Sequence, residues 1–176
     1  MGVEKHRLRR QFDLYDLGLL TGPSLKGATI VVETVKGLLK TSSAAFVIFD
    51  AMERLVLIRA KTFPLAGNQS YPLHRSALLP VEDGGFVLAL KDLSKEAPST
   101  AEATDMKMNA LLASAVYGPD EKPIGALVAF DAAARIWSEL DVQNLGNLAY
   151  LITQEVTLHA SFATLELMSV EKALPS

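Results

Sequence analysis

The sequence predicts an α+β domain in which helices lie on one face of a mostly antiparallel sheet. Three observations favour this class. Short apolar segments come in adjacent pairs joined by brief polar connections, as in antiparallel hairpins. Amphipathic helical patterns stand before and after these segments. Two long irregular stretches, 61–85 and 91–110, are the natural cover for the second face of the sheet, and a space beneath them would hold a small molecule.

Two amphipathic helices are predicted before the first strand. Within residues 4–20, apolar side chains at Leu8 and Phe12 begin a stripe spaced by four, three and four residues. The basic residues around this stripe indicate a solvated helix face, with a membrane-surface or nucleic-acid role as the alternative. A Thr-Gly-Pro-Ser break follows, and a second stripe at helical spacing occupies 25–40.

The strands are predicted from short apolar runs rich in β-branched and aromatic residues. Their ranges are 44–50, 55–60, 86–90, 111–117 and 124–131. The first two runs are almost continuously apolar, which favours central strands covered on both faces.

The last helix carries clear start signals. Ser138 is a candidate N-cap with Asp141 three residues on, and Trp137 and Val142 match a hydrophobic staple. The apolar stripe that follows consists of Val142, Leu145, Ala149, Ile152, Val156, Ala160, Ala163, Leu167 and Val170. About 34 residues at about 1.5 Å each give a rod of about 50 Å, which would overhang a domain of this size. A helix kinked or frayed after His159 is the alternative.

Composition excludes several kinds of protein. The chain contains no cysteine, which rules out disulfide scaffolds, zinc ribbons and cysteine nucleophiles. A net charge of −3 argues against a nucleic-acid-binding surface. No apolar run approaches the ~20 residues needed to span a bilayer, so we expect no membrane association. The three histidines are far apart, and no metal site is expected. These features predict a soluble cytoplasmic protein.

Residues 123–156 resemble the end of a GAF domain, the small-molecule sensory module of signalling proteins. The resemblance rests on the strand Ile124–Asp131, the Trp137-Ser138 cap and the Asp141 that follows it, and the Leu148-Ala149 pair of the last helix. The helix at 25–40 followed by Ala-Ala-Phe-Val-Ile-Phe-Asp is similar to the family's beginning. The match covers about residues 25 to 158.

The resemblance implies a GAF/PAS-like sheet of five or six antiparallel strands, with terminal helices on one face and a ligand pocket under the crossovers. It divides the chain into an N-terminal helix and linker (1–22), a sensory domain (23–158) and an extension of the last helix (159–176). Family members sense cyclic nucleotides, tetrapyrroles, haem or other metabolites, and many only dimerise. They pass signals to a kinase, cyclase, phosphodiesterase or transcription factor.

Departures from the family pattern narrow the range of possible ligands. Without cysteine, covalent bilin attachment is excluded, and so is the family's cysteine-dependent reduction of free methionine sulfoxide. The Asn-Lys-x-x-x-Phe-x-x-x-Asp-Glu pattern of cyclic-nucleotide members is not found. We therefore expect no cofactor, and an unidentified small metabolite as ligand.

Five candidate ligand-binding residues lie in the first half of the chain. Tyr71, His74, Arg75 and Ser76 fall in the irregular region placed over the pocket, and Arg75 would suit a carboxylate or phosphate. The alternative is a polar loop that faces water. Arg59 lies inside an apolar strand, where it either anchors an anionic ligand or reaches solvent at the strand end.

Tyr117 and Phe130 are further candidates for the pocket wall, with ordinary core packing as the alternative. An enzyme acting through His74 and Asp131 is a third possibility, because these groups suit acid–base chemistry if they converge. The sequence spacing gives no reason to expect that convergence.

The favoured hypothesis is a non-catalytic sensory domain that binds a small metabolite and relays a signal through its terminal helices in a homodimer. The candidate interface residues are Leu8, Phe12, Ile152, Val156 and His159. A degenerate domain that serves only for dimerisation is the alternative. Either would act on an output domain or a partner regulator.

Overall fold

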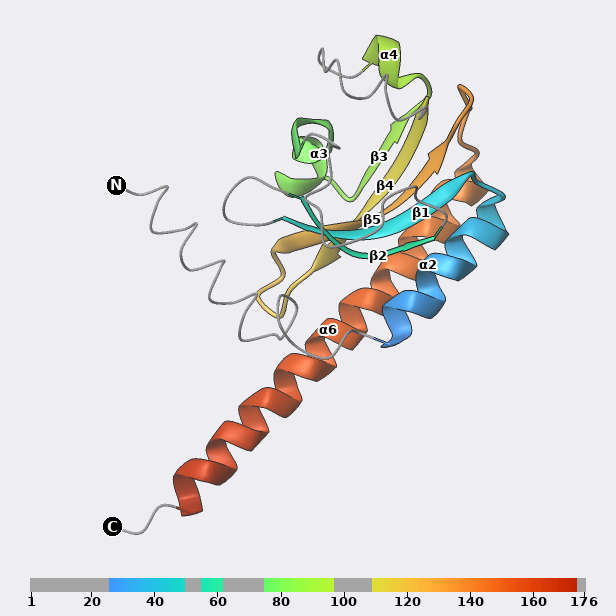
Figure 1. Cartoon of the computed structure of the whole chain (residues 1–176). Coiled ribbons are helices and arrows are strands. Elements are labelled where there is room, and N and C mark those ends of the chain that lie inside the picture. Colours follow the sequence, from blue (N-terminus) through green and yellow to red (C-terminus); the bar gives the residue numbers. More distant parts are fainter. Residues whose placement is uncertain (1–25, 50–54, 62–74, 97–108, 174–176) are drawn as a thin grey trace, which may run out of the picture.

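The computed structural model describes residues 26–49, 55–61, 75–96 and 109–173 of the 176-residue chain. In chain order (Figure 1), the elements are α2 (Lys26–Leu39), β1 (Ser43–Phe49), β2 (Leu55–Lys61), α3 (Arg75–Glu82), β3 (Val87–Leu90), α4 (Leu93–Glu96), β4 (Ala110–Tyr117), β5 (Pro123–Asp131) and α6 (Glu139–Ala173). The helix predicted at 4–20 lies outside the described residues.

The strands form one sheet in the order β2-β1-β5-β4-β3, with every neighbouring pair antiparallel. The α+β class and the antiparallel sheet are therefore confirmed. β1 and β5 are far apart in sequence but lie side by side, with Phe46 opposite Leu127. Gly125 permits this close approach, because a Cβ atom there would collide with the Val47 carbonyl oxygen.

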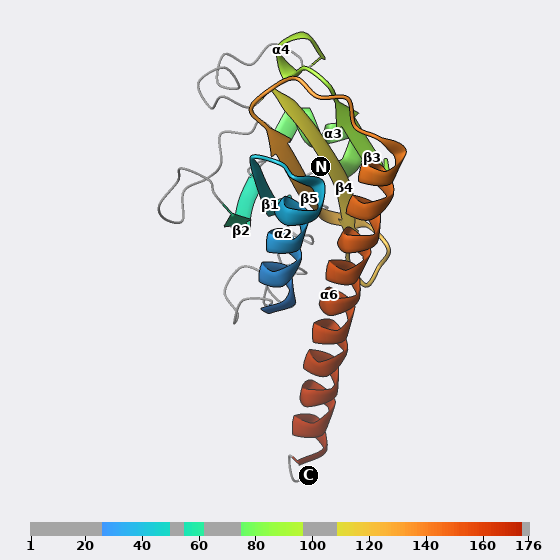
Figure 2. The ribbon, with the colours of Figure 1, turned by 90° about the vertical axis from the view of Figure 1, so that its right-hand side faces the viewer.

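Helices α2 and α6 cover one face of the sheet, which we call the helical face (Figure 2). Alternate side chains of the central strands, such as Phe46 and Leu127, meet Val35 of α2 and Leu145 of α6 in one buried cluster. The two helices also contact each other directly, since the main-chain N–H of Gly27 donates to Glu155 Oε1 at 2.9 Å. This bond places a carboxylate at the start of α2, where the helix dipole favours negative charge.

The opposite face of the sheet, which we call the α3 face, lies under α3 (Figure 1). Leu78 and Val81 of α3 and Leu93 at the start of α4 bury their side chains in the cluster on this face, together with Phe130 of β5. The sequence predicted that the two irregular stretches would cover this second face of the sheet. Their described residues include the short helices α3 and α4, which lie on that face.

The N-terminus of α6 has the predicted capping box. Ser138 N donates to Asp141 Oδ2 at 3.0 Å, and Asp141 N donates to Ser138 Oγ at 3.1 Å. Trp137 is buried in the same cluster against which Val142 packs, as expected for a staple.

From this start, α6 runs 35 residues without interruption, about 52 Å at 1.5 Å per residue. Its C-terminal part extends well beyond the sheet (Figures 1 and 2). The helix continues through His159, in contrast to the kinked alternative. Among the described residues, no helix is both long enough and apolar enough to cross a membrane.

Candidate functional site on the α3 face

Tyr117 lies at an irregularity at the end of β4. The pairing register between β4 and β5 shifts between Val116 and Tyr117, because β5 carries an extra residue, Ile124, opposite this point, as in a bulge of β5. The main-chain N–H of Tyr117 donates to Thr153 Oγ1 of α6 at 3.1 Å. Thr153 Oγ1 in turn donates to Ala149 O, one turn earlier in α6, at 3.2 Å. Tyr117 therefore sits where the sheet is bonded to the long helix.

The side chain of Tyr117 packs on the other side of the sheet, against the cluster of the α3 face. Its hydroxyl is buried and has no hydrogen-bond partner among the residues that the structure describes. Burial raises the pKa of this phenol above its ordinary value of 10.0, so the group is neutral and can donate a hydrogen bond at physiological pH. A buried hydroxyl without a partner costs about 1–3 kcal/mol, so a ligand atom that bonds to it would recover that cost.

Phe86 adds an exposed aromatic surface beside the ring of Tyr117. Its centroid lies 6.0 Å from that of Tyr117 with the rings tilted by 50°, and Phe86 is 75% exposed. Its position is fixed through the main chain, because Phe86 O accepts hydrogen bonds from Ala115 N at 3.0 Å and from Ser114 Oγ at 3.3 Å. An exposed ring next to a buried hydroxyl suits a small molecule with both a flat apolar part and a polar atom.

Sequence reasoning missed Phe86 as a site residue and used it only as the start of a strand. The signal was available in the alternation of the strand. Leu88 and Leu90 pack on the α3 face, so Phe86, two residues before Leu88, belongs to the same face. Its proximity to Tyr117 depends on the pairing of β3 with β4, which sequence alone did not give.

The other predicted ligand-binding residues have different placements. Phe130 is fully buried in the core of the α3 face, so the core-packing alternative describes its side chain in the folded chain. Arg59 lies in β2, with its backbone opposite Phe46, and Arg75 and Ser76 form the start of α3. The side chains of these three residues, and all of Tyr71 and His74, lie outside the described residues.

The described candidate interface residues on α6 divide into two groups. Ile152 and Val156 are fully buried between the sheet and α2, so their side chains have no surface to offer a partner in the folded chain. This differs from the expectation, and the reason is that the predicted stripe is the face that covers the sheet. His159 is exposed. Leu8 and Phe12 lie outside the described residues.

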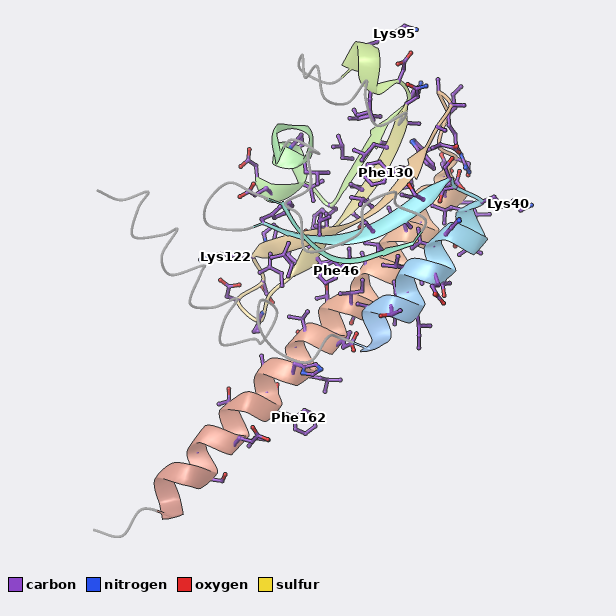
Figure 3. The ribbon with its side chains drawn as sticks, in the orientation of Figure 1. Lys40, Phe46, Lys95, Lys122, Phe130 and Phe162 are labelled. Carbon is purple, nitrogen blue, oxygen red and sulfur yellow. The ribbon has the colours of Figure 1, made fainter. Side chains whose placement is uncertain are left out.

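The outward side of α6 carries a second row of apolar side chains, which we call the outer stripe. Its members are between 54% and 65% exposed: Leu140, Tyr150, Leu151, Leu158, Phe162, Leu165 and Met168. Leu151, Leu158 and Leu165 are seven residues apart, which is the spacing of a coiled-coil seam. Figure 3 shows Phe162 projecting from the part of α6 that extends beyond the sheet.

Asp131, the residue considered for an enzymatic role, belongs to an ion cluster that holds the start of α6. Arg135 Nη1 lies 3.2 Å from Asp131 Oδ2, and its Nη2 lies 3.4 Å from Asp141 Oδ2. The guanidinium also stacks over Trp137, 4.6 Å from the ring centroid. Ser42 Oγ donates to the other oxygen of Asp131 at 2.9 Å. Both oxygens of this carboxylate are thus engaged by the protein.

Burial alone would raise the pKa of Asp141, but the hydrogen bonds from Ser138 and the charge of Arg135 outweigh it. The net effect is a pKa below the ordinary value of 3.8, so Asp141 stays ionised at the helix N-terminus. Within residues 26–49, 55–61, 75–96 and 109–173, no group of three or more His, Asp or Glu side chains is placed to hold a metal ion.

No protein-family model and no curated protein sequence matches the chain. Solved structures do match it. The GAF domain of PixJ from Thermosynechococcus elongatus, in its blue-light absorbing form, superposes with a TM-score of 0.67 at 18% identity, covering 93% of this chain and 97% of that one. The GAF domain of an Acinetobacter phosphoenolpyruvate-protein phosphotransferase gives a TM-score of 0.61 at 19% identity, with coverages of 82% and 92%.

A third similar structure is the free methionine-R-sulfoxide reductase of Neisseria meningitidis in complex with its substrate. Its TM-score is 0.64 at 18% identity, and the match covers 79% of this chain and 80% of that one. These likenesses confirm the fold implied by the sequence resemblance, which is that of a GAF domain.

Proposed function

We propose that this chain is a non-catalytic sensory domain that binds a small molecule on the α3 face and relays the binding through α6. The buried hydroxyl of Tyr117, which has no partner among the described residues, carries the proposal, because it is a polar group within an apolar cluster and Phe86 stands exposed beside its ring. The fold supports a sensory role, since it is shared with the light-absorbing domain of PixJ and with a GAF domain attached to a phosphotransferase.

The ligand class follows from these two side chains. The exposed ring of Phe86 offers an apolar contact, and the neutral phenol of Tyr117 offers one hydrogen bond. A small metabolite with a ring or other flat apolar part and one polar atom at its edge suits that pair.

An enzymatic role has less support. The reductase with this fold was solved with its substrate, so the fold does permit catalysis. The present chain has no cysteine to act as a nucleophile or redox group, and both carboxylate oxygens of Asp131 are already engaged.

We further propose that α6 relays the signal in a homodimer, with the outer stripe in place of Ile152 and Val156 as the interface. The seven exposed side chains of the stripe offer on the order of 700 Å² per copy, close to the ~800 Å² per partner of a standard interface. Leu151, Leu158 and Leu165 would meet their counterparts along a seam.

The test of ligand binding is native mass spectrometry of freshly purified protein, followed by thermal-shift measurements with any compound found. We expect an added small mass, and a rise in melting temperature that is lost in Tyr117→Phe. Lys122→Gln is the control, because Lys122 is exposed in the β4–β5 turn and forms an ion pair with nearby Asp120. A compound that stabilises the wild type and Tyr117→Phe equally would refute the site.

The second candidate function is a dimerisation module without a ligand, and the outer stripe is the observation that favours it. A dimer with no added mass, together with an unchanged melting temperature across a metabolite library, would support this alternative over the sensory proposal. A strict monomer at micromolar concentration would refute the dimer in both proposals.

A further inference from the structure

Tyr117, at the end of β4 and opposite the irregularity of β5, connects the two faces of the sheet. The hydroxyl and ring of Tyr117 lie on the α3 face, while its main-chain N–H donates to Thr153 Oγ1 of α6 on the helical face, at 3.1 Å. A side chain on the proposed ligand surface is therefore only a few covalent bonds away from a hydrogen bond to the long helix.

This hydrogen bond differs in kind from the apolar contacts that the described side chains of α6 make with the sheet. Leu145 and Ile152 meet the sheet through apolar packing, which has little directional preference. The bond from Tyr117 to Thr153 is directional, and it binds one turn of α6 to one point of β4. A change in the position of that point would turn or shift the helix, because a half-buried N–H that loses its acceptor is costly.

Tyr117 stands where the pairing between β4 and β5 changes register, because Ile124 of β5 has no partner on β4. The register of the β4–β5 ladder shifts between Val116 and Tyr117, so the residue stands at a break in the regular pairing. A small displacement there would leave the pairs from Ala110 to Val116 in place.

We propose that Tyr117 is a positioning residue that transmits ligand binding on the α3 face to α6 through Thr153. A polar ligand atom that bonds to the phenol draws the ring, the main chain of Tyr117 follows, and the hydrogen bond to Thr153 shortens or breaks. The helix then shifts between two arrangements, as in other small-displacement switches. This inference rests on the proposed sensory function.

The test needs no ligand. Tyr117→Phe removes only the hydroxyl and keeps the ring, so ring-current effects on NMR signals change little. In full-length ¹⁵N-labelled protein, we expect Tyr117→Phe to move the amide signals of residues 150–156 on the far face of the sheet. In a Thr153→Val background, which keeps the side-chain shape but removes the hydroxyl, the same change should move those signals at least about twofold less.

Two further variants make the outcome specific. Thr153→Ser keeps the hydroxyl and should preserve the full response, and it also serves if Thr153→Val folds poorly. Thr157→Val is the matched control. Thr157 lies one turn after Thr153 and its Oγ1 donates to the Thr153 carbonyl oxygen, and neither of these atoms takes part in the bond with Tyr117. In the Thr157→Val background, Tyr117→Phe should move the amide signals of residues 150–156 as far as it does in the wild type.

The proposal would be overturned if Tyr117→Phe moved the amide signals of residues 150–156 equally in the wild-type and Thr153→Val backgrounds. It would also be overturned if Tyr117→Phe did not move them at all. Because the measurement uses the free protein, a failed search for a ligand does not affect it. Conversely, failure here leaves ligand binding at Tyr117 to be decided by the thermal-shift comparison.

Discussion

Two residues of similar size on different sides of α6, Ile152 and Leu158, test which face of the helix is core and which is surface. Ile152 is fully buried against the sheet and α2, whereas Leu158 is 58% exposed in the outer stripe. Six residues separate them, and at about 100° per residue they point in directions about 120° apart. Truncating each to alanine should therefore separate folding stability from association.

The expected magnitudes differ strongly. Ile152→Ala removes a fully buried side chain and leaves a cavity, which costs about 3–4 kcal/mol, or about 10 °C in melting temperature for a chain of this size. Leu158→Ala removes a side chain that is already more than half in water, so the free energy of unfolding of the monomer should fall by less than about 1 kcal/mol. The dimer dissociation constant, by contrast, should rise at least about tenfold for Leu158→Ala.

The assay is urea unfolding followed by circular dichroism at a protein concentration low enough to populate the monomer, with sedimentation velocity across a concentration series. Dilution matters, because dimerisation itself raises apparent stability by mass action. Equal destabilisation of the monomer by the two variants would refute the assignment of faces. An unchanged dissociation constant for Leu158→Ala would refute the outer stripe as the interface.

Four further predictions concern single residues. Ser138→Ala should lower the free energy of unfolding by about 1 kcal/mol in urea unfolding, because it removes the cap of α6, and a cost below ~0.3 kcal/mol would contradict the cap. The Asp141 carboxylate contributes stability above its unfolded pKa of about 3.9, and this is lost as pH falls through its lower folded pKa, so Asp141→Asn should flatten the stability profile below about pH 4. Burial raises the pKa of Tyr117 in the folded chain, so the stability of the folded chain should fall as pH rises above about 10. Thermal unfolding should show a smaller fall in Tyr117→Phe. Lys40→Gly should stabilise the chain by about 0.5–1 kcal/mol in the same urea assay, because Lys40 has a φ of 53° after α2; a loss of stability would contradict this.

Elements with strong local signals were predicted well. The apolar runs of β1, β4 and β5 and the capping residues of α6 act through neighbours in sequence, so alternation and cap chemistry place them within a residue or two. The short helix α3 was not predicted. Its eight residues contain Pro80, which is unfavourable inside a helix, and burial of Leu78 and Val81 against the sheet stabilises it there.

The candidate site could be predicted only in part. Tyr117 was singled out from the sequence, but the burial of its hydroxyl without a partner among the described residues depends on the fold, and its bond to Thr153 depends on where α6 crosses β4. Phe86 was overlooked because its partner lies 31 residues away in sequence and meets it only through strand pairing. Contacts of this kind arise from the register of the sheet, which local patterns do not encode.

The class of the fold, the order of its main elements and the start of the long helix could be predicted from the residues alone, because hydrophobic period and capping are local properties of the chain. The packing of the folded chain sets which apolar stripe of α6 is core and which is surface. Both stripes follow helical spacing, and only the position of the sheet and α2 distinguishes Ile152, which they bury, from Leu158, which they leave in water. The same packing places Tyr117 in contact with both faces of the sheet, because the bulge of β5 and a crossing helix meet at that residue.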